Sequence, residues 1–335
     1  MRTLSGLAVL NPGGRDPDQS FADGPGEPSE KVHAPINYHG YAACTRGAFY
    51  RTAELAAQHE SVLLLLRNNL DDARRAIEIL KARGCFIAIS FKESGTHQVA
   101  NLLSRPKRIG LFREIAAAVD LCVSSTADLL PLYDAVSKRA VFVPTPYPLE
   151  FESWNFRQPL ENRRGVLIGT REFSVLSRNH FLALATAKTL ATPITVMNPD
   201  GKAGARALEA LNFATDQLNI LSPMNYPSYL RMMASHRFVL QFDQSSVPGQ
   251  VAGDTLLCRI PTVGGNGAIE RIAFPALNGH GHGFDELAAL ANRLLKEEKF
   301  YQDQVEDLEK ISNERLSFGA VREMLRKLLP GISAG

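Results

Sequence analysis

The chain has 335 residues, of which 45% are hydrophobic and 21% charged, a globular composition that excludes wholesale disorder. Its 37 Lys and Arg against 35 Asp and Glu leave a formal charge of +2, without the basic excess of a dedicated nucleic-acid binder. No apolar run approaches the ~20 residues that span a bilayer, and the N-terminus shows no secretion signal. We therefore expect a cytoplasmic protein of two domains, with no nucleic-acid partner and no integral membrane segment.

The first predicted elements alternate between apolar strands and amphipathic helices. Strands are expected at residues 4–10, 61–67, 85–90, 121–123 and 140–143. Helices are expected at residues 71–83, 95–118 and 127–138, with Pro106 breaking or kinking the second of them. Strands that read as continuous apolar runs separated by helices indicate a parallel sheet covered on both faces. This part of the chain is therefore predicted to be a Rossmann-like α/β domain.

Two Pro-rich segments interrupt the pattern. Residues 11–40 are too long for an ordinary connection, and they are either a mobile functional loop or a disordered segment. Residues 144–164 carry four prolines and no sustained period. We place the first domain at residues 1–148, a linker at 149–164 and the second domain at 165–335.

A second α/β series follows the linker. Strands are expected at residues 165–169, 193–197, 218–221, 237–242 and 261–263. Helices are expected at residues 178–190, 203–211, 249–258 and 284–295, with another helical, charged segment closing the chain. Asn225 is predicted to cap one more helix, with Pro227 in its first turn. The pattern predicts a second parallel-sheet domain.

Residues suited to an anion follow three strands of the second domain. Arg171 and Arg178 follow the strand at 165–169, and Pro248-Gly249-Gln250 leads from the strand at 237–242 into a helix. A glycine-rich stretch at 264–267 follows the last strand. Ligands of open parallel sheets bind beyond the carboxyl ends of the strands, and helix N-termini favour negative charge. The three parts together predict an anion-binding site.

The stretch from about residue 165 to 330 resembles the nucleotide-sugar-binding half of GT-B glycosyltransferases, in the large, mostly retaining family with a Glu-x7-Glu motif. The resemblance rests on GTREFSVLSR, NILSPMNYPSYLRMMASHRFVLQFDQSS and VPGQVAGDTLLCRIPTVGGNGAIE. It implies two Rossmann-like domains that face each other across a cleft. It also implies that Arg171, Arg178, Gly249 and Gln250 bind the donor diphosphate.

The motif acids depart from the family pattern. By resemblance, the second acid is Asp254, which with Met224 would bind the ribose and nucleotide, and Ser246 replaces the first acid beside the sugar. A serine cannot supply charge there, so the stereochemical outcome stays open, although the family favours retention. The implied substrates are a nucleotide-sugar donor and an acceptor that is a glycan or a small molecule.

The chemistry requires stabilisation of a departing diphosphate, and the cations and helix N-terminus suffice without a metal or other cofactor. The acceptor is expected in the first domain, where a His or tuned carboxylate would act as base. Glu93, His97 and His39 are the candidates, the last in the loop at 11–40. The four cysteines, Cys44, Cys85, Cys122 and Cys258, form no metal-ligand pair and are predicted to be buried thiols.

Other functions fit less well. The chain lacks the G-x-G-x-x-G spacing of a nicotinamide dehydrogenase and the G-x-S-x-G of a hydrolase. A solute-binding protein would need a secretion signal. Two alternatives remain: a non-catalytic glycosyltransferase-like binding subunit, which Ser246 favours, and a sugar-nucleotide epimerase of the same fold.

Overall fold

The computed structural model describes residues 4–169, 173–214 and 216–333. Contacts divide the chain into two units. The first unit contains the residues up to Phe151, Ser246–Pro248 and the residues from Glu314 onward. The second unit contains Glu152–Ser245 and Gly249–Asn313.

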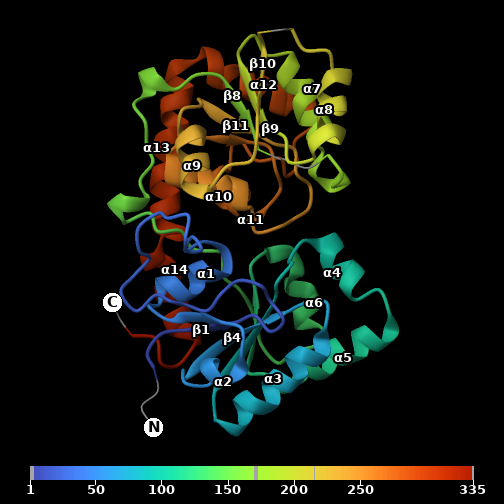
Figure 1. Cartoon of the computed structure of the whole chain (residues 1–335), viewed down its shortest axis with the longest axis vertical. Coiled ribbons are helices and arrows are strands. Elements are labelled where there is room, and N and C mark those ends of the chain that lie inside the picture. Colours follow the sequence, from blue (N-terminus) through green and yellow to red (C-terminus); the bar gives the residue numbers. More distant parts are fainter. Residues whose placement is uncertain (1–3, 170–172, 215, 334–335) are drawn as a thin grey trace. The chain divides into compact units, whose positions relative to one another are not determined.

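The first unit is built on a seven-stranded sheet of order β2-β3-β1-β4-β5-β6-β7 (Figure 1). Its strands are β1 (Ala8–Leu10), β2 (Gln19–Ser20), β3 (Ala48–Tyr50), β4 (Ser61–Leu66), β5 (Phe86–Phe91), β6 (Leu121–Ser124) and β7 (Ala140–Phe142). Only the edge pair β2–β3 is antiparallel. The predicted parallel sheet is confirmed, while β2 and β3 are too short to show a period and were not expected.

Helices cover both faces of this sheet, as its apolar strands require. They are α1 (Asn37–Cys44), α2 (Ala53–Ala56), α3 (Leu70–Ala82), α4 (Thr96–Leu102), α5 (Pro106–Ala118), α6 (Leu130–Asp134) and α14 (Phe318–Leu328), with a 3-10 turn at Ala127–Leu129. Alternate residues of β4 point to opposite faces of the sheet. On one face, Leu64 and Leu66 pack in the core that includes residues of α3 and α5. On the other face, Leu63 and Leu65 pack in the core that includes residues of α1 and α14. Pro106 is the first residue of α5, so the break it predicts is confirmed.

The C-terminal helix α14 belongs to the first unit, although the predicted second domain ran to residue 335. Phe318, Val321 and Leu325 are buried in the core that also holds Tyr41 of α1. Glu150 accepts hydrogen bonds from the backbone of Phe318 and Gly319, which fixes the start of the helix. The apolar stripe of α14 is visible in the sequence, but helix α1, against which it packs, is nearly the whole chain away in sequence.

The second unit holds a five-stranded, all-parallel sheet of order β10-β9-β8-β11-β12. Its strands are β8 (Val166–Ile168), β9 (Ile194–Met197), β10 (Leu218–Leu221), β11 (Phe238–Leu240) and β12 (Thr262–Val263). Its helices are α7 (His180–Lys188), α8 (Gly201–Ala210), α9 (Tyr226–Ala234), α10 (Gln250–Cys258), α11 (Ala268–Ala273), α12 (Phe284–Lys296) and α13 (Glu298–Arg315), with 3-10 turns at Glu152–Trp154, Leu160–Asn162 and Leu176–Arg178. The predicted second α/β domain is confirmed.

Local signals placed several boundaries correctly. The Asn225 side chain accepts a hydrogen bond of 2.9 Å from the Ser228 amide and caps α9, as predicted.

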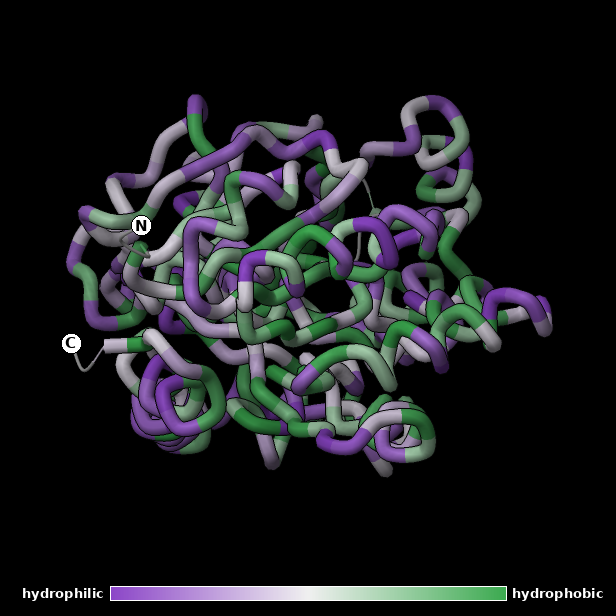
Figure 2. The backbone as a smooth tube through the Cα atoms, turned by 90° about the horizontal axis from the view of Figure 1, so that it is seen from below, coloured by the Kyte–Doolittle hydropathy of each residue, from purple (hydrophilic) through white to green (hydrophobic). Residues whose placement is uncertain are grey.

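Cys44, Cys122 and Cys258 are buried free thiols, whereas Cys85 is half-buried. Figure 2 shows that hydrophobic and hydrophilic stretches alternate along the whole chain. Within the described residues no helix is both long and apolar enough to cross a membrane.

Candidate functional site

The loops that follow β8, β11 and β12, three adjacent strands of the second sheet, are tied together. The carbonyl of Ser177, after β8, accepts a hydrogen bond of 2.8 Å from the amide of Gln244, after β11. The carbonyl of Asp243, in the same loop, accepts one of 2.9 Å from the amide of Asn266, after β12. These three loops are therefore held side by side at the carboxyl edge of the sheet, as parallel topology predicts.

Helix α10 begins at this edge with a glycine that no other residue can replace without strain. Gly249 caps the helix with φ of +94°, and a Cβ there would lie 2.1 Å from Oε2 of Glu270. Gly265, at φ of +74°, faces Oε1 of the same carboxyl, 2.8 Å from its would-be Cβ. The first amides of a helix have no intrahelical acceptor and carry its positive dipole end. The two glycines thus allow a buried carboxyl to pack directly against the start of α10.

Glu270 is that carboxyl, and it is only 2% exposed. Gln241 Nε2 donates a hydrogen bond of 2.8 Å to Oε1, and Oε2 has no hydrogen-bond partner among the described residues. Burial raises the pKa of Glu270 to about 8; neighbouring Asp243 also raises it, while Arg271 and the Gln241 bond lower it. The group is therefore mostly protonated at pH 7, and it does not cancel the positive field of the helix terminus.

The expected cations lie on the segment between β8 and α7. Arg178 ends the 3-10 turn at Leu176–Arg178 and is half-buried. The pKa of the adjacent His180 is lowered to about 4, mainly by burial; the Asp200 charge raises it and the Arg178 charge lowers it. His180 is therefore neutral at pH 7. Arg171 lies outside the described residues, so its pairing with Arg178 stays a prediction.

A second cluster joins the start of α9 to α10. Asp254 is fully buried, and Tyr226 Oη donates a hydrogen bond of 2.6 Å to its Oδ1. Met224, exposed, lies just before Asn225, which caps α9. Tyr226 thus contacts Asp254, and Met224 comes two residues before Tyr226; the pairing of Met224 with Asp254 that the resemblance implies stays a prediction. Sequence reasoning missed Tyr226, whose signal is an aromatic residue directly after a helix cap.

Ser246 lies in the loop between β11 and α10. It is half-buried and has a φ of +49°, a left-handed conformation that costs a non-glycine residue roughly 1 kcal/mol or more. The packing around Ser246 therefore stabilises this backbone conformation. Its role beside the sugar stays a prediction.

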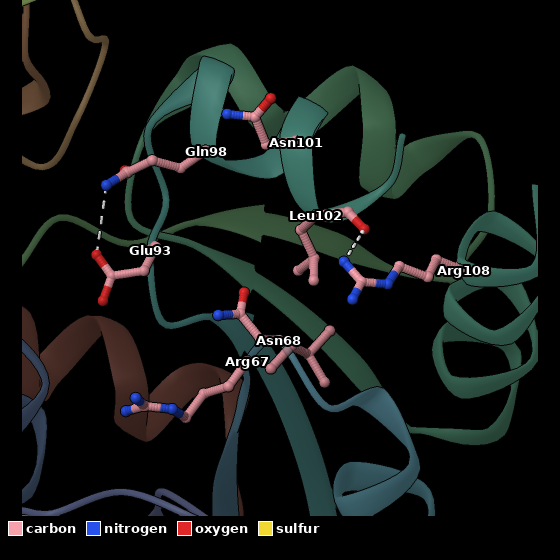
Figure 3. A pocket seen from close by; sticks show the side chains of 8 residues that line it. Arg67, Asn68, Glu93, Gln98, Asn101, Leu102 and Arg108 are labelled. Carbon is pink, nitrogen blue, oxygen red and sulfur yellow. Dashed lines mark hydrogen bonds between the residues drawn. The ribbon is translucent and has the colours of Figure 1, made fainter. Parts of the chain in front are cut away.

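In the first unit, a polar cavity of about 520 Å³ lies past the carboxyl ends of β4 and β5 (Figure 3). Its polar lining is Arg67, Asn68, Glu93, Gln98, Asn101 and Arg108. Glu93, one of the predicted base candidates, is exposed and is the only carboxylate among these lining residues. The cavity places an acid side chain within a set of hydrogen-bonding groups suited to hydroxyls.

The two histidine candidates are elsewhere. His97 is exposed in the first turn of α4 and does not line the cavity. His39 is not in a loop, as predicted, but in helix α1, where its ring stacks on Phe49 at 3.8 Å. Burial lowers the pKa of His39 to about 3. The error has a physical cause, because the Gly- and Pro-rich sequence around α1 hides a buried helix whose aromatic residues pack against the sheet.

Among the described residues, no group of three or more His, Cys, Asp or Glu side chains is arranged to hold a metal ion. The groups that gather at the second sheet's edge are instead backbone amides, a guanidinium and a neutral carboxyl. Such groups bind anions.

No family model matches the chain, and no curated protein matches it in sequence. Solved structures do match its fold. HepE from Anabaena, in complex with UDP and glucose, superposes with a TM-score of 0.62 at 11% identity over 82% of this chain and 79% of that chain. Sucrose-phosphate synthase from Thermosynechococcus elongatus gives 0.64 at 10% identity over 97% and 98%. An α,α-trehalose 6-phosphate synthase from Burkholderia multivorans gives 0.56 at 12% identity over 88% and 77%. The chain therefore has the GT-B fold of these glycosyltransferases, as its sequence resemblance predicted.

Proposed function

We propose that the protein is a glycosyltransferase that moves a sugar from a nucleotide-diphosphate sugar to an acceptor. The observation that carries the proposal is the start of α10, where Gly249 packs against the buried Glu270 carboxyl at the carboxyl edge of the second sheet. Solved proteins of this fold include complexes with UDP, among them HepE. A uridine nucleotide is therefore the first donor to test.

The donor diphosphate would lie at the N-terminus of α10. As the bond to the sugar breaks, negative charge grows on the departing oxygens, and fixed donors aimed at that charge are worth roughly 10²–10³ in rate apiece. The candidates are the amides of Gly249 and Gln250, the Arg178 guanidinium and, by resemblance, Arg171. These groups support a reaction that needs no divalent metal.

The nucleoside would occupy the neighbourhood of Met224, Tyr226 and Asp254. The phenol of Tyr226 is held by the buried Asp254 carboxyl, so the acid orients a half-buried side chain at the start of α9. A ribose hydroxyl can bond to the half-buried Tyr226 phenol, through which the fully buried Asp254 would act. We assign Asp254 to the ribose and Met224 to the base, in keeping with the resemblance.

On the acceptor side, we assign the base to Glu93, because it lines the polar cavity of the first unit, and keep exposed His97 as the second candidate. Ser246 would lie beside the sugar and carries no charge. Retention follows the family pattern, and the anomeric configuration of the product, read by NMR, tests it.

Ser246 also supports the second candidate, a non-catalytic binding subunit. Calorimetry with UDP and UDP-glucose, followed by product analysis with and without a chelator, separates the two. Nucleotide binding without hydrolysis or transfer favours the binding subunit. Activity that vanishes with chelator and returns with Mg²⁺ contradicts the metal-independent reaction. Failure of every nucleotide diphosphate to bind contradicts both candidates.

A further inference from the structure

The cavity of the first unit lies past the carboxyl ends of β4 and β5, next to the point between β1 and β4 where the strand order reverses. From β1 the chain goes to β2 and β3 on one side and then to β4 on the other side of β1. Ligands of open α/β sheets bind in the crevice at such a reversal. Asn11 follows β1 and Arg67 follows β4, and Arg67 Nη1 donates a hydrogen bond of 3.3 Å to Asn11 Oδ1. The cavity therefore lies outside the carboxyl ends of parallel strands, where ligands of such sheets bind, and Arg67 connects it to the reversal.

Two guanidinium groups line this cavity without a carboxylate partner. Arg67 bonds to Asn11, and Arg108 Nη1 donates a hydrogen bond of 3.2 Å to the carbonyl of Leu102. Both side chains are half-buried, and neither forms an ion pair with any described residue. By contrast, Arg74 of α3 pairs with Asp71 at 3.1 Å.

A guanidinium has five N–H donors, so most of those on Arg67 and Arg108 are not used by the protein. Removing them from water without an acceptor costs free energy, which an oxyanion would recover through charge-assisted, bidentate bonds. The charges of the lining residues sum to +1, from two arginines and Glu93.

The lining is also polarised. Figure 3 shows Glu93, Gln98 and the guanidinium of Arg67 on one side of the cavity and Arg108 on the other, with Asn68 between them, so only the Arg108 side has a cation without a nearby carboxylate. The amides of Asn68, Gln98 and Asn101 offer both donors and acceptors, which suit hydroxyl groups. A ligand that fits this order carries an anion at one end and hydroxyls at the other.

We propose that the acceptor is a sugar or polyol that carries an oxyanion, a phosphate or a carboxylate, with the anion at Arg108 and a hydroxyl at Glu93. This inference rests on the proposed function. In the transfer, the acceptor oxygen forms a bond to the anomeric carbon of the donor and its proton passes to the Glu93 carboxylate. The bond from that carbon to the diphosphate oxygen breaks, and its electron pair leaves with the diphosphate.

Three probes that differ only at C6 of one ring test the inference: glucose 6-phosphate, glucuronate and glucose. Calorimetry on the whole chain, with and without saturating UDP, measures each affinity. We expect at least one charged probe to bind ten-fold or more tighter than glucose, and its identity distinguishes a phosphate from a carboxylate. Equal affinities, or no binding by any of the three, overturn the inference.

A matched pair of variants locates the anion. Arg108→Gln should weaken the preferred charged probe at least ten-fold and leave glucose and UDP affinity unchanged. Arg113→Gln removes an exposed guanidinium from the same helix α5 and should change nothing. An equal loss in both variants, at unchanged melting temperature, overturns the assignment.

The same titrations distinguish failure of this inference from failure of the proposed function. UDP binding without preference for a charged probe overturns this inference alone. A preference for a charged probe without binding of any nucleotide overturns the proposed function instead.

Discussion

The carboxyl edges of the two sheets offer opposite kinds of site. In the second unit, glycines, a buried amide and the neutral Glu270 pack tightly around the start of α10. In the first unit, half-buried and exposed polar side chains line a cavity of about 520 Å³. Ligand binding at the start of α10 should be sensitive to substitutions that add atoms, because a packed core resists added atoms. Ligand binding in the open polar cavity should instead be sensitive to substitutions that change charge. The predictions below test this contrast.

The largest expected effect is on chemistry in the open cavity. Glu93→Gln removes the proposed base while preserving shape, and kcat should fall roughly 10²–10⁴-fold with little change in KM for the donor. Glu114→Gln, an exposed change on α5 of the same unit, is the control and should keep full activity. An unaffected kcat in Glu93→Gln would transfer the role to His97.

The shape prediction comes next. Gly249→Ala places a methyl group against the Glu270 carboxyl and strains φ, so UDP affinity should fall about 100-fold or more, close to 3 kcal/mol. Gly281→Ala is the control, because Gly281 has a φ of +83° but nothing within 4 Å of its would-be Cβ. Similar UDP affinity in the two variants would show that the packing at α10 is not part of the site.

Loss of the Arg178 charge should lower UDP affinity less than the Gly249→Ala substitution does. Arg178→Gln removes a charge-assisted bond worth about 1.5–3 kcal/mol, so UDP should bind roughly 10–100-fold more weakly, with the melting temperature unchanged. Arg206→Gln removes an exposed guanidinium of α8 in the same unit and should leave the affinity intact. Calorimetry on both variants checks the assignment, and unchanged binding removes Arg178 from it.

The smallest expected effect on affinity is the pH response of Glu270. Its folded pKa of about 8 exceeds the ordinary value of 4.5, so the folded state holds the proton more tightly. The resulting stability is fully present below pH ~4.5 and is lost as pH rises toward and through ~8. Above that pH, the new negative charge should also weaken UDP binding severalfold.

Glu270→Gln keeps an acceptor for Gln241 and cannot ionise. Its melting temperature and UDP affinity should therefore vary less between pH 5 and pH 9 than those of the wild type. Parallel pH profiles of the two proteins would mean that another group is responsible.

Much of the fold could be predicted because its signals are local. The apolar runs at 61–67 and 85–90 became β4 and β5, Pro106 began α5, and Asn225 capped α9. The resemblance added the GT-B fold, which the solved structures confirm. His39 was misplaced because the helix that holds it has no clear apolar period.

The amino-acid sequence by itself determined the parallel sheets, the helix starts and the chemistry available after each strand, since these depend on residues close together in the chain. Tertiary structure alone decided the pairing of Gln241 with Glu270, which are 29 residues apart, and of Tyr226 with Asp254, 28 apart. It also placed α14 against α1 in the first unit. Such contacts depend on how whole elements pack, and packing sets the burial that keeps Glu270 protonated and leaves Arg67 and Arg108 facing a cavity.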